Sequence, residues 1–151
     1  MKTHGELAKQ LFFDGYNCAQ SVFCAFCDVH GMSMEDAARL SSSFGGGMGR
    51  LREVCGALSG IFMVIGHLYG GYAPTDHEAK VAHYTMIQEL AAKFQAKYDT
   101  IICRDILGLP AGPSVPVPEA HTPEYLATRP CPGCVQAAAD ILDEFLKEHQ
   151  A

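Results

Sequence analysis

The sequence predicts an all-α protein, a compact bundle of five to seven helices around a central apolar helix at about residues 50–70. Apolar residues recur at spacings of three and four in several segments, and helix-capping residues stand ahead of them. No segment shows the alternation of a half-buried strand. With 151 residues, 48% of them hydrophobic and 19% charged, we expect one domain over residues 1–151 with a single core.

Three helices are predicted before the glycine run. The first covers residues 6–13 and ends near Gly15, a residue suited to a helix end. Asn17, with Gln20 three residues later, resembles a capping box and opens a second helix that runs to about His30. A third helix follows at residues 34–44.

The apolar helix and a long amphipathic helix come next. The segment "GALSGIFMVIGHLYG" continues a helix that we expect to begin near Arg50. Thr75 and Glu78 form a second predicted capping box, ahead of a long helix. One apolar stripe is expected on that helix: Val81, Tyr84, Ile87, Leu90, Ala91 and Phe94.

The carboxy-terminal third holds a short helix, a loop and a final helix. "IICRDILG" predicts the short helix, and "CVQAAADILDEFLKEH" predicts the last one, with Val135, Ala138 and Phe145 on one face. The proline-rich segment between them, residues 109–123, has a length typical of a functional loop or an irregular clamp.

The composition of the chain argues against several classes of function. The net charge is −6 and the eleven Lys and Arg form no basic run, which argues against a nucleic-acid surface. The longest apolar segment, residues 54–69, is shorter than the roughly 20 residues of a membrane span, and the amino terminus lacks the apolar centre of a secretory signal. We therefore expect a cytoplasmic protein that does not span a membrane. In that reducing setting seven cysteines are reactive thiols, metal ligands or buried small hydrophobes rather than structural disulfides.

Several thiols stand at predicted helix starts. They are Cys18, Cys103 and Cys131. Cys55 is expected about a turn and a half into its helix, with Arg50 and Arg52 nearby in sequence. A helix amino terminus stabilises negative charge, so we expect low thiol pKa values at these positions. Since thiolate is both the nucleophile of disulfide exchange and the form that binds metal, placement alone leaves both uses open.

The glycine run ahead of Cys55 has two interpretations. Consecutive residues with positive φ can point their N–H groups inward as an anion-binding nest, or the run can be a sharp turn between two helices. The candidate cofactor- or anion-binding residues are Gly45, Gly46, Gly47, Gly49 and Arg50. Gly56 and Gly60 lie one helical turn apart, so a second helix can approach the Cys55 helix closely.

The sequence contains two Cys-x-x-Cys pairs, and they differ in how strongly they indicate a functional role. Cys24 and Cys27, in the middle of the predicted second helix, are expected to be buried small hydrophobes, and their role stays open. Cys131 and Cys134, in "CPGC", lie at a helix start as in dithiol oxidoreductases, although the βαβ context of thioredoxin is missing. For this pair, a redox or metal-binding role and a simple packing role both stay open. About a hundred residues separate the two pairs, far beyond zinc-ribbon spacing.

Four stretches together resemble the C_GCAxxG_C_C family, to which redox activity is ascribed from its cysteines. They are "GYNCAQSV" (15–22), "FGGGMGRLREVCGALSG" (44–60), "CRDILG" (103–108) and "CPGCVQAAADIL" (131–142). The resemblance implies an all-helical bacterial or archaeal protein with four shared cysteines, which map to Cys18, Cys55, Cys103 and Cys131. Cys24, Cys27 and Cys134 are departures, since the family more usually has an aromatic residue at position 134.

The leading hypothesis is a thiol redox protein acting by dithiol/disulfide exchange or electron transfer, and the corresponding enzyme class is a thiol oxidoreductase. The candidate catalytic thiols are Cys18, Cys55, Cys103, Cys131 and Cys134. Cys55 is expected to be central because its helix is the most apolar, with Arg50, Arg52 and the glycine loop stabilising negative charge. The expected partner is an unidentified redox protein or small thiol.

Two alternatives stay open. Cys18, Cys55, Cys103 and Cys131 could ligate zinc or an iron–sulfur cluster, although no cofactor is predicted with certainty. The glycine loop could instead make the protein a small-anion-binding module. The apolar helix could be buried inside one chain or between two, so a homo-oligomer is also compatible with the sequence.

Overall fold

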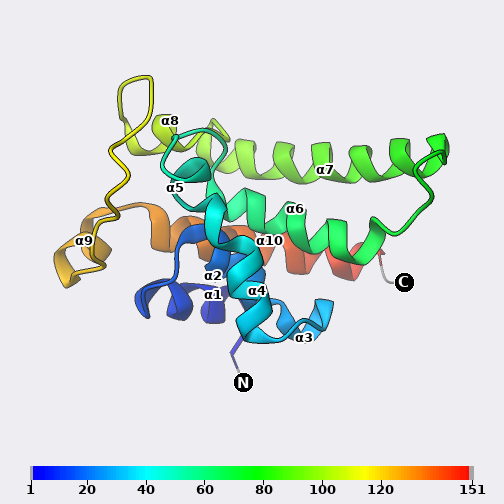
Figure 1. The fold of residues 1–151 in the computed structure, drawn as a ribbon, viewed down its shortest axis with the longest axis horizontal. Coiled ribbons are helices and arrows are strands. Elements are labelled where there is room, and N and C mark those ends of the chain that lie inside the picture. Colours follow the sequence, from blue (N-terminus) through cyan, green and yellow to red (C-terminus); the bar gives the residue numbers. More distant parts are fainter. Residues whose placement is uncertain (1, 150–151) are drawn as a thin grey trace.

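The computed structural model describes residues 2–149 and is all-α (Figure 1). Its longer helices are α1 (His4–Phe13), α2 (Cys18–Ala25), α4 (Met34–Ser41), α6 (Gly56–Tyr69), α7 (His77–Tyr98) and α10 (Cys131–His149). The short ones are α3 (Cys27–His30), the 3-10 turn η1 (Ser42–Phe44), α5 (Gly45–Met48), α8 (Cys103–Leu107) and α9 (Pro123–Thr128). Within the described range no strand forms, and extended pairing is limited to one isolated antiparallel bridge between Val54 and Ile102.

The predicted apolar helix lies at the centre of the bundle as α6. It contacts α2, α7 and α10, while α1 packs against α2 and α10. The buried apolar side chains form one contiguous cluster to which α1, α2, α6, α7 and α10 all contribute. Its largest fully buried members include Phe12, Phe23, Phe26, Phe94, Phe145, Leu58, Ile61 and Ile65.

The start of α6 differs from the prediction. The helix begins at Gly56 rather than near Arg50. Arg50 and Arg52 have φ angles of 67° and 62°, in the left-handed region, which a right-handed helix cannot include. Contacts from another part of the chain hold them there, as described below.

Gly56 and Gly60 bring α6 against α2, as the sequence predicts. A Cβ atom at Gly60 would lie 2.8 Å from Val22 Cβ and 3.1 Å from the Ala19 carbonyl oxygen. At Gly56 it would lie 3.0 Å from the Ala19 nitrogen and 3.1 Å from Cys18 Cβ. Both positions therefore need glycine, and their contact sets the distance between the start of α6 and the start of α2.

Side-chain caps account for the starts of α1, α2, α4, α7 and α9. Asn17 and Gln20 form the predicted capping box, with N–H···O distances of 2.9 and 3.0 Å. Ser33 caps α4 as expected. The cap of α7 lies one residue later than predicted, since Asp76 rather than Thr75 accepts from the N–H at position 79.

The predicted helix from Asn17 to His30 is two helices. Phe26, with φ −103° and ψ 20°, interrupts it between α2 and α3. Cys24 therefore lies near the end of α2, and Cys27 is the first residue of α3. Helix α9, capped by Thr122, was not predicted and follows directly on the proline-rich loop, residues 109–122.

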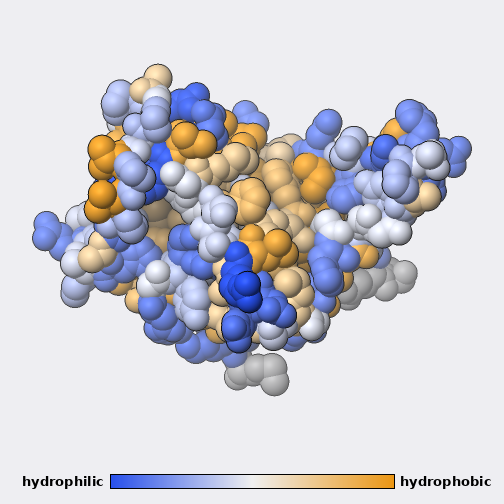
Figure 2. Space-filling model, viewed as in Figure 1, coloured by the Kyte–Doolittle hydropathy of each residue, from blue (hydrophilic) through white to orange (hydrophobic). Residues whose placement is uncertain are grey.

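The apolar stripe of α7 is only partly covered. Leu90 and Phe94 are buried, but Val81 and Tyr84 are 52% and 60% exposed. Figure 2 shows further apolar surface at the proline-rich loop, where Val115 and Val117 are exposed. No helix in residues 2–149 has the length and apolar character needed to cross a membrane.

The contact of α6 with α2 can be tested by a matched pair of substitutions. Gly60→Ala places a methyl group against Val22 and the α2 backbone, so we expect a loss of about 1–3 kcal/mol in the free energy of unfolding. Gly66→Ala, on the same helix, has no neighbour within 4 Å and should be neutral or stabilise by about 0.5–1 kcal/mol. Urea unfolding followed by circular dichroism measures both. Equal stability of the two variants would contradict the close approach.

Candidate functional site

Five thiols from four helices gather at one place. Cys18, Cys103 and Cys131 are the first residues of α2, α8 and α10, Cys55 is the N-cap of α6, and Cys134 lies one turn into α10. All five line one small cavity of about 20 Å³. We call this group the thiol cluster. All of its members are free thiols.

A short antiparallel pairing places Cys55 beside Cys103. The N–H of Cys55 donates to the Ile101 carbonyl at 2.8 Å, and the N–H of Cys103 donates to the Glu53 carbonyl at 2.6 Å. Helices α6 and α8 both begin at this pairing. Cys55 is thus at a helix start too, and not the turn and a half inside a helix that the sequence suggests.

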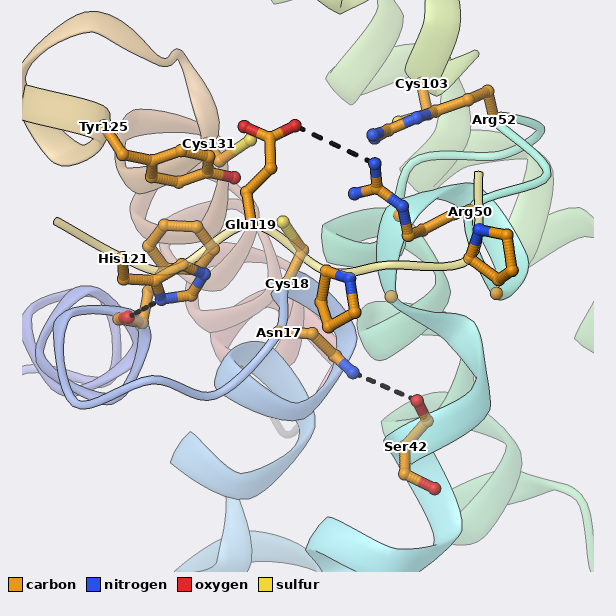
Figure 3. Close-up of a pocket in the computed structure, with 16 residues that line it drawn as sticks. Asn17, Cys18, Ser42, Arg50, Arg52, Cys103, Glu119, His121, Tyr125 and Cys131 are labelled. Atoms are coloured by element: carbon orange, nitrogen blue, oxygen red, sulfur yellow. Dashed lines mark hydrogen bonds and ion pairs between the residues drawn. The ribbon is translucent and has the colours of Figure 1, made fainter. Parts of the chain in front are cut away.

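Three cluster thiols also face an open pocket of about 350 Å³ (Figure 3). They are Cys18, Cys103 and Cys131. Cys55 and Cys134 do not line this pocket and are only 6% and 2% exposed. The thiol cluster therefore has an outer part open to small molecules and an inner part closed to them.

The glycine loop forms one wall of the pocket in an unusual conformation. Residues 46–50 all have φ between 57° and 69°, a left-handed turn, and Arg52 follows with 62°. This conformation costs a non-glycine residue about 1–2 kcal/mol. A Cβ at Gly47 would lie 2.7 Å from Cys103 Cβ, so glycine is also needed there for the approach to the cluster.

The N–H groups after the glycine run are used inside the loop. Those of Arg50, Arg52 and Glu53 donate to the carbonyls of Gly45, Gly46 and Gly47 at 3.3, 3.2 and 2.9 Å. Of the predicted nest residues, Arg50 and Gly49 therefore have their N–H groups engaged within the loop, since the Gly49 N–H also donates to the Gly45 carbonyl. The nest at the remaining glycines stays a prediction, and the arginine side chains of the loop add positive charge to the pocket.

Arg52 is buried between the thiols and the proline-rich loop. Its side chain is 5% exposed. Nε–H donates to Ser114 Oγ at 2.8 Å, and Nη1–H donates to Cys103 Sγ at 3.5 Å. The guanidinium therefore fixes the loop on one side and touches the thiol cluster on the other.

Arg50 holds the same loop from the rim. Its Nε–H donates to the Val115 carbonyl at 2.7 Å, and its own carbonyl accepts from the Ser114 N–H at 2.9 Å. Nη2 lies 3.8 Å from Glu119, which Arg129 also binds at 2.7 Å. The proline-rich loop is thus a clamp on the pocket, one of the two roles that its length suggests.

Cys131 is the most acidic thiol at the pocket. A hydrogen bond from the Cys18 thiol, one from the Tyr125 hydroxyl and the charges of Arg129 and Arg52 lower its pKa to about 7, against the opposing effect of burial. The same hydrogen bond, with burial, raises the pKa of Cys18 well above its usual value. At neutral pH, Cys131 is therefore partly ionised, while Cys18 stays protonated.

The inner pair repeats this arrangement. A hydrogen bond from Cys55 and another from the Tyr98 hydroxyl lower the pKa of Cys134, while the bond to Cys134 and burial raise that of Cys55. Burial also raises the pKa of Cys103 in spite of Arg52. Low pKa values at every helix start were therefore a wrong prediction, because burial and neighbouring thiols outweigh the helix ends.

The remaining predicted residues lie elsewhere. Cys24 is buried, and burial raises its pKa to about 11, while Cys27 is half-buried; neither belongs to the thiol cluster. In the part of the chain that the structure describes, no three His, Cys, Asp or Glu side chains have the arrangement of a metal site. The sequence reasoning missed Tyr98 and Tyr125, since nothing in their spacing marks them.

The comparisons with known proteins identify a family. The model for "Putative redox-active protein (C_GCAxxG_C_C)" matches residues 16–145, and the chain belongs to this family. The matched region contains the whole thiol cluster and the glycine loop. No curated protein and no solved structure matches the chain.

The acidity of Cys131 predicts a pH profile. Its alkylation by iodoacetamide, followed by peptide mass spectrometry, should rise with pH and reach half its maximum near pH 7, because only thiolate reacts. Tyr125→Phe removes a donor to that thiolate and should move the midpoint to higher pH. Tyr98→Phe, whose hydroxyl serves Cys134 instead, is the matched control and should leave the Cys131 midpoint unchanged. A midpoint near the ordinary thiol value in the unmodified protein would show that the Cys18 and Tyr125 hydrogen bonds do not form.

Proposed function

We propose that this member of the C_GCAxxG_C_C family is a thiol–disulfide redox protein in which Cys131 attacks the substrate and Cys18 resolves the product. The observation that carries the proposal is that Cys18 and Cys131, each at the start of a helix, line both the open pocket and the same small cavity. Cys131 combines access, thiolate character and a neighbour able to complete a disulfide, which nucleophilic exchange requires.

The first half-reaction uses the Cys131 thiolate. Its sulfur attacks one sulfur of a disulfide substrate, the substrate S–S bond breaks, and the leaving thiolate departs with the electron pair and takes a proton from solvent. Cys131 is then held in a mixed disulfide. Tyr125, whose own pKa is raised above its usual value chiefly by burial, stays protonated as a hydrogen-bond donor throughout.

The second half-reaction uses Cys18. Once the Cys131 sulfur is covalently bound it carries no charge, so the largest cause of the high Cys18 pKa disappears. Cys18 then loses its proton and attacks Cys131, and the second substrate thiolate leaves. One substrate disulfide has been reduced to two thiols. The protein has lost two electrons and gained a Cys18–Cys131 disulfide.

The inner pair offers a second step within the protein. Cys134 lines the same small cavity as Cys131 and is one helical turn away. Its thiolate can attack Cys131 in the outer disulfide and release Cys18, after which Cys55 attacks Cys134 and releases Cys131. The outer dithiol is thereby restored and the disulfide moves to Cys55 and Cys134. In this scheme Cys55 is a store for oxidising equivalents and not the attacking thiol.

The outer pair can be tested by trapping. With a small disulfide, the double variant Cys18→Ser/Cys134→Ser should accumulate the mixed disulfide on Cys131, because it lacks both thiols that can attack Cys131 in the scheme. The unmodified protein should instead show a Cys18–Cys131 linkage by peptide mass spectrometry. Cys27→Ser changes a half-buried thiol outside the cluster and should behave like the unmodified protein. If Cys131→Ser reduces the small disulfide at the rate of the unmodified protein, the assignment is overturned.

The inner pair can be tested by counting disulfides. Full oxidation of the reduced protein should form two disulfides per chain, Cys18–Cys131 and Cys55–Cys134, and release four electrons. Cys55→Ser should stop at one disulfide, with the outer pair still competent. If that variant still forms two cluster disulfides, or if the outer disulfide never exchanges inward, the inner pair has no such role.

A further inference from the structure

Arg52 is a buried cation that pairs with no carboxylate among residues 2–149, and its two hydrogen-bond acceptors are the Ser114 hydroxyl and the Cys103 sulfur. Cys103 does not neutralise it, since burial raises the pKa of that thiol. The Cys131 thiolate offsets part of this buried charge, because Arg52 contributes to its lowered pKa. That compensation is lost once Cys131 forms a disulfide, so an acidic group on the substrate is expected to pair with Arg52 during the reaction.

The charges around the pocket also favour an anionic ligand. Arg50 and Arg52 both line it, and the acidic side chain of the lining, Glu119, lies between two arginines, 2.7 Å from Arg129 and 3.8 Å from Arg50. The helices that begin at Cys18 and Cys131 add partial positive charge at its floor. The pocket is therefore positive in a protein whose net charge is −6.

The size and the walls of the pocket fit a small molecule. Its volume of about 350 Å³ is at the lower end of the range for small-molecule sites. Phe12, Pro116, Pro118 and Tyr125 contribute apolar surface to its walls. Arg52 touches Cys103, which shares the pocket with Cys131, so an acidic group on Arg52 leaves the rest of a short ligand over the thiols.

We propose that the pocket selects a small sulfur electrophile that carries an acidic group, with the acid bound by Arg52 and the electrophilic sulfur presented to Cys131. The substrate class is a short acidic disulfide or thiosulfonate, written R–S–X with the negative charge on R. Cys131 forms a new S–S bond to R–S, and X leaves with the electron pair. Cys18 then displaces R–S as a thiolate. This inference rests on the proposed function, and it adds the substrate.

Two probes of similar size and opposite charge provide the test. The 2-sulfonatoethyl and 2-(trimethylammonio)ethyl methanethiosulfonates transfer anionic and cationic groups to a thiolate, with methanesulfinate leaving. Loss of free Cys131, followed by peptide mass spectrometry, gives a rate for each probe. Both rates are proportional to the fraction of Cys131 that is thiolate, so this fraction cancels in their ratio. A change in the pKa of Cys131 therefore cannot be mistaken for a preference for one probe charge.

We expect the anionic-to-cationic rate ratio at Cys131 to exceed that of free 2-mercaptoethanol by about tenfold or more, which corresponds to about 1.4 kcal/mol. Arg52→Gln should remove most of this preference, and Arg52→Lys should keep part of it, which separates lost charge from lost folding. Arg39→Gln changes an exposed arginine outside the pocket and should leave the ratio unaltered.

The outcomes separate this inference from the proposed function. If the ratio at Cys131 equals that of 2-mercaptoethanol while the Cys18–Cys131 disulfide still forms, the acidic substrate is wrong and the redox role stands. If Cys131 reacts with neither probe, both proposals are wrong. An unchanged ratio in Arg52→Gln would also overturn the assignment of Arg52.

Discussion

The contact between α2 and α6 is the constraint on which the thiol cluster depends. Gly56 and Gly60 let the two backbones approach so closely that a Cβ at either position would collide with Ala19 or its neighbours. This approach puts Cys18, at the start of one helix, next to Cys55, at the start of the other. The remaining thiols arrive from α8, through its backbone pairing with residues 53–55, and from α10.

In the thiol cluster, hydrogen bonds between side chains shift the thiol pKa values more than the helix amino termini do. Each acidic thiol has a second thiol and a tyrosine hydroxyl as donors, and each donor thiol has a raised pKa. These contacts thus divide four similar thiols into two with lowered and two with raised pKa values. The arginines of the glycine loop, with φ in the left-handed region, add positive charge to the pocket lining.

Local interactions explain why much of the fold could be predicted. Apolar spacing identified α1, α6, α7 and α10, and the caps at Asn17 and Ser33 are contacts between residues three apart. The errors fall where distant residues intervene. Arg50 and Arg52 leave the helical region because Ser114 and Val115, more than sixty residues later, hold their side chains. Which part of α7 is exposed likewise depends on which other helices pack against it.

The sequence by itself determined the helical class, the apolar central helix and the four shared cysteines, because spacing, capping and motif are properties of neighbouring residues. Only the tertiary structure decided which thiol meets which, that Cys134 joins Cys55, and that Tyr98 and Tyr125 donate to them. It also buried Arg52 at the pocket without an ion pair to any carboxylate of residues 2–149. These are contacts between segments tens of residues apart, and their geometry is set by helix packing, which no local pattern encodes.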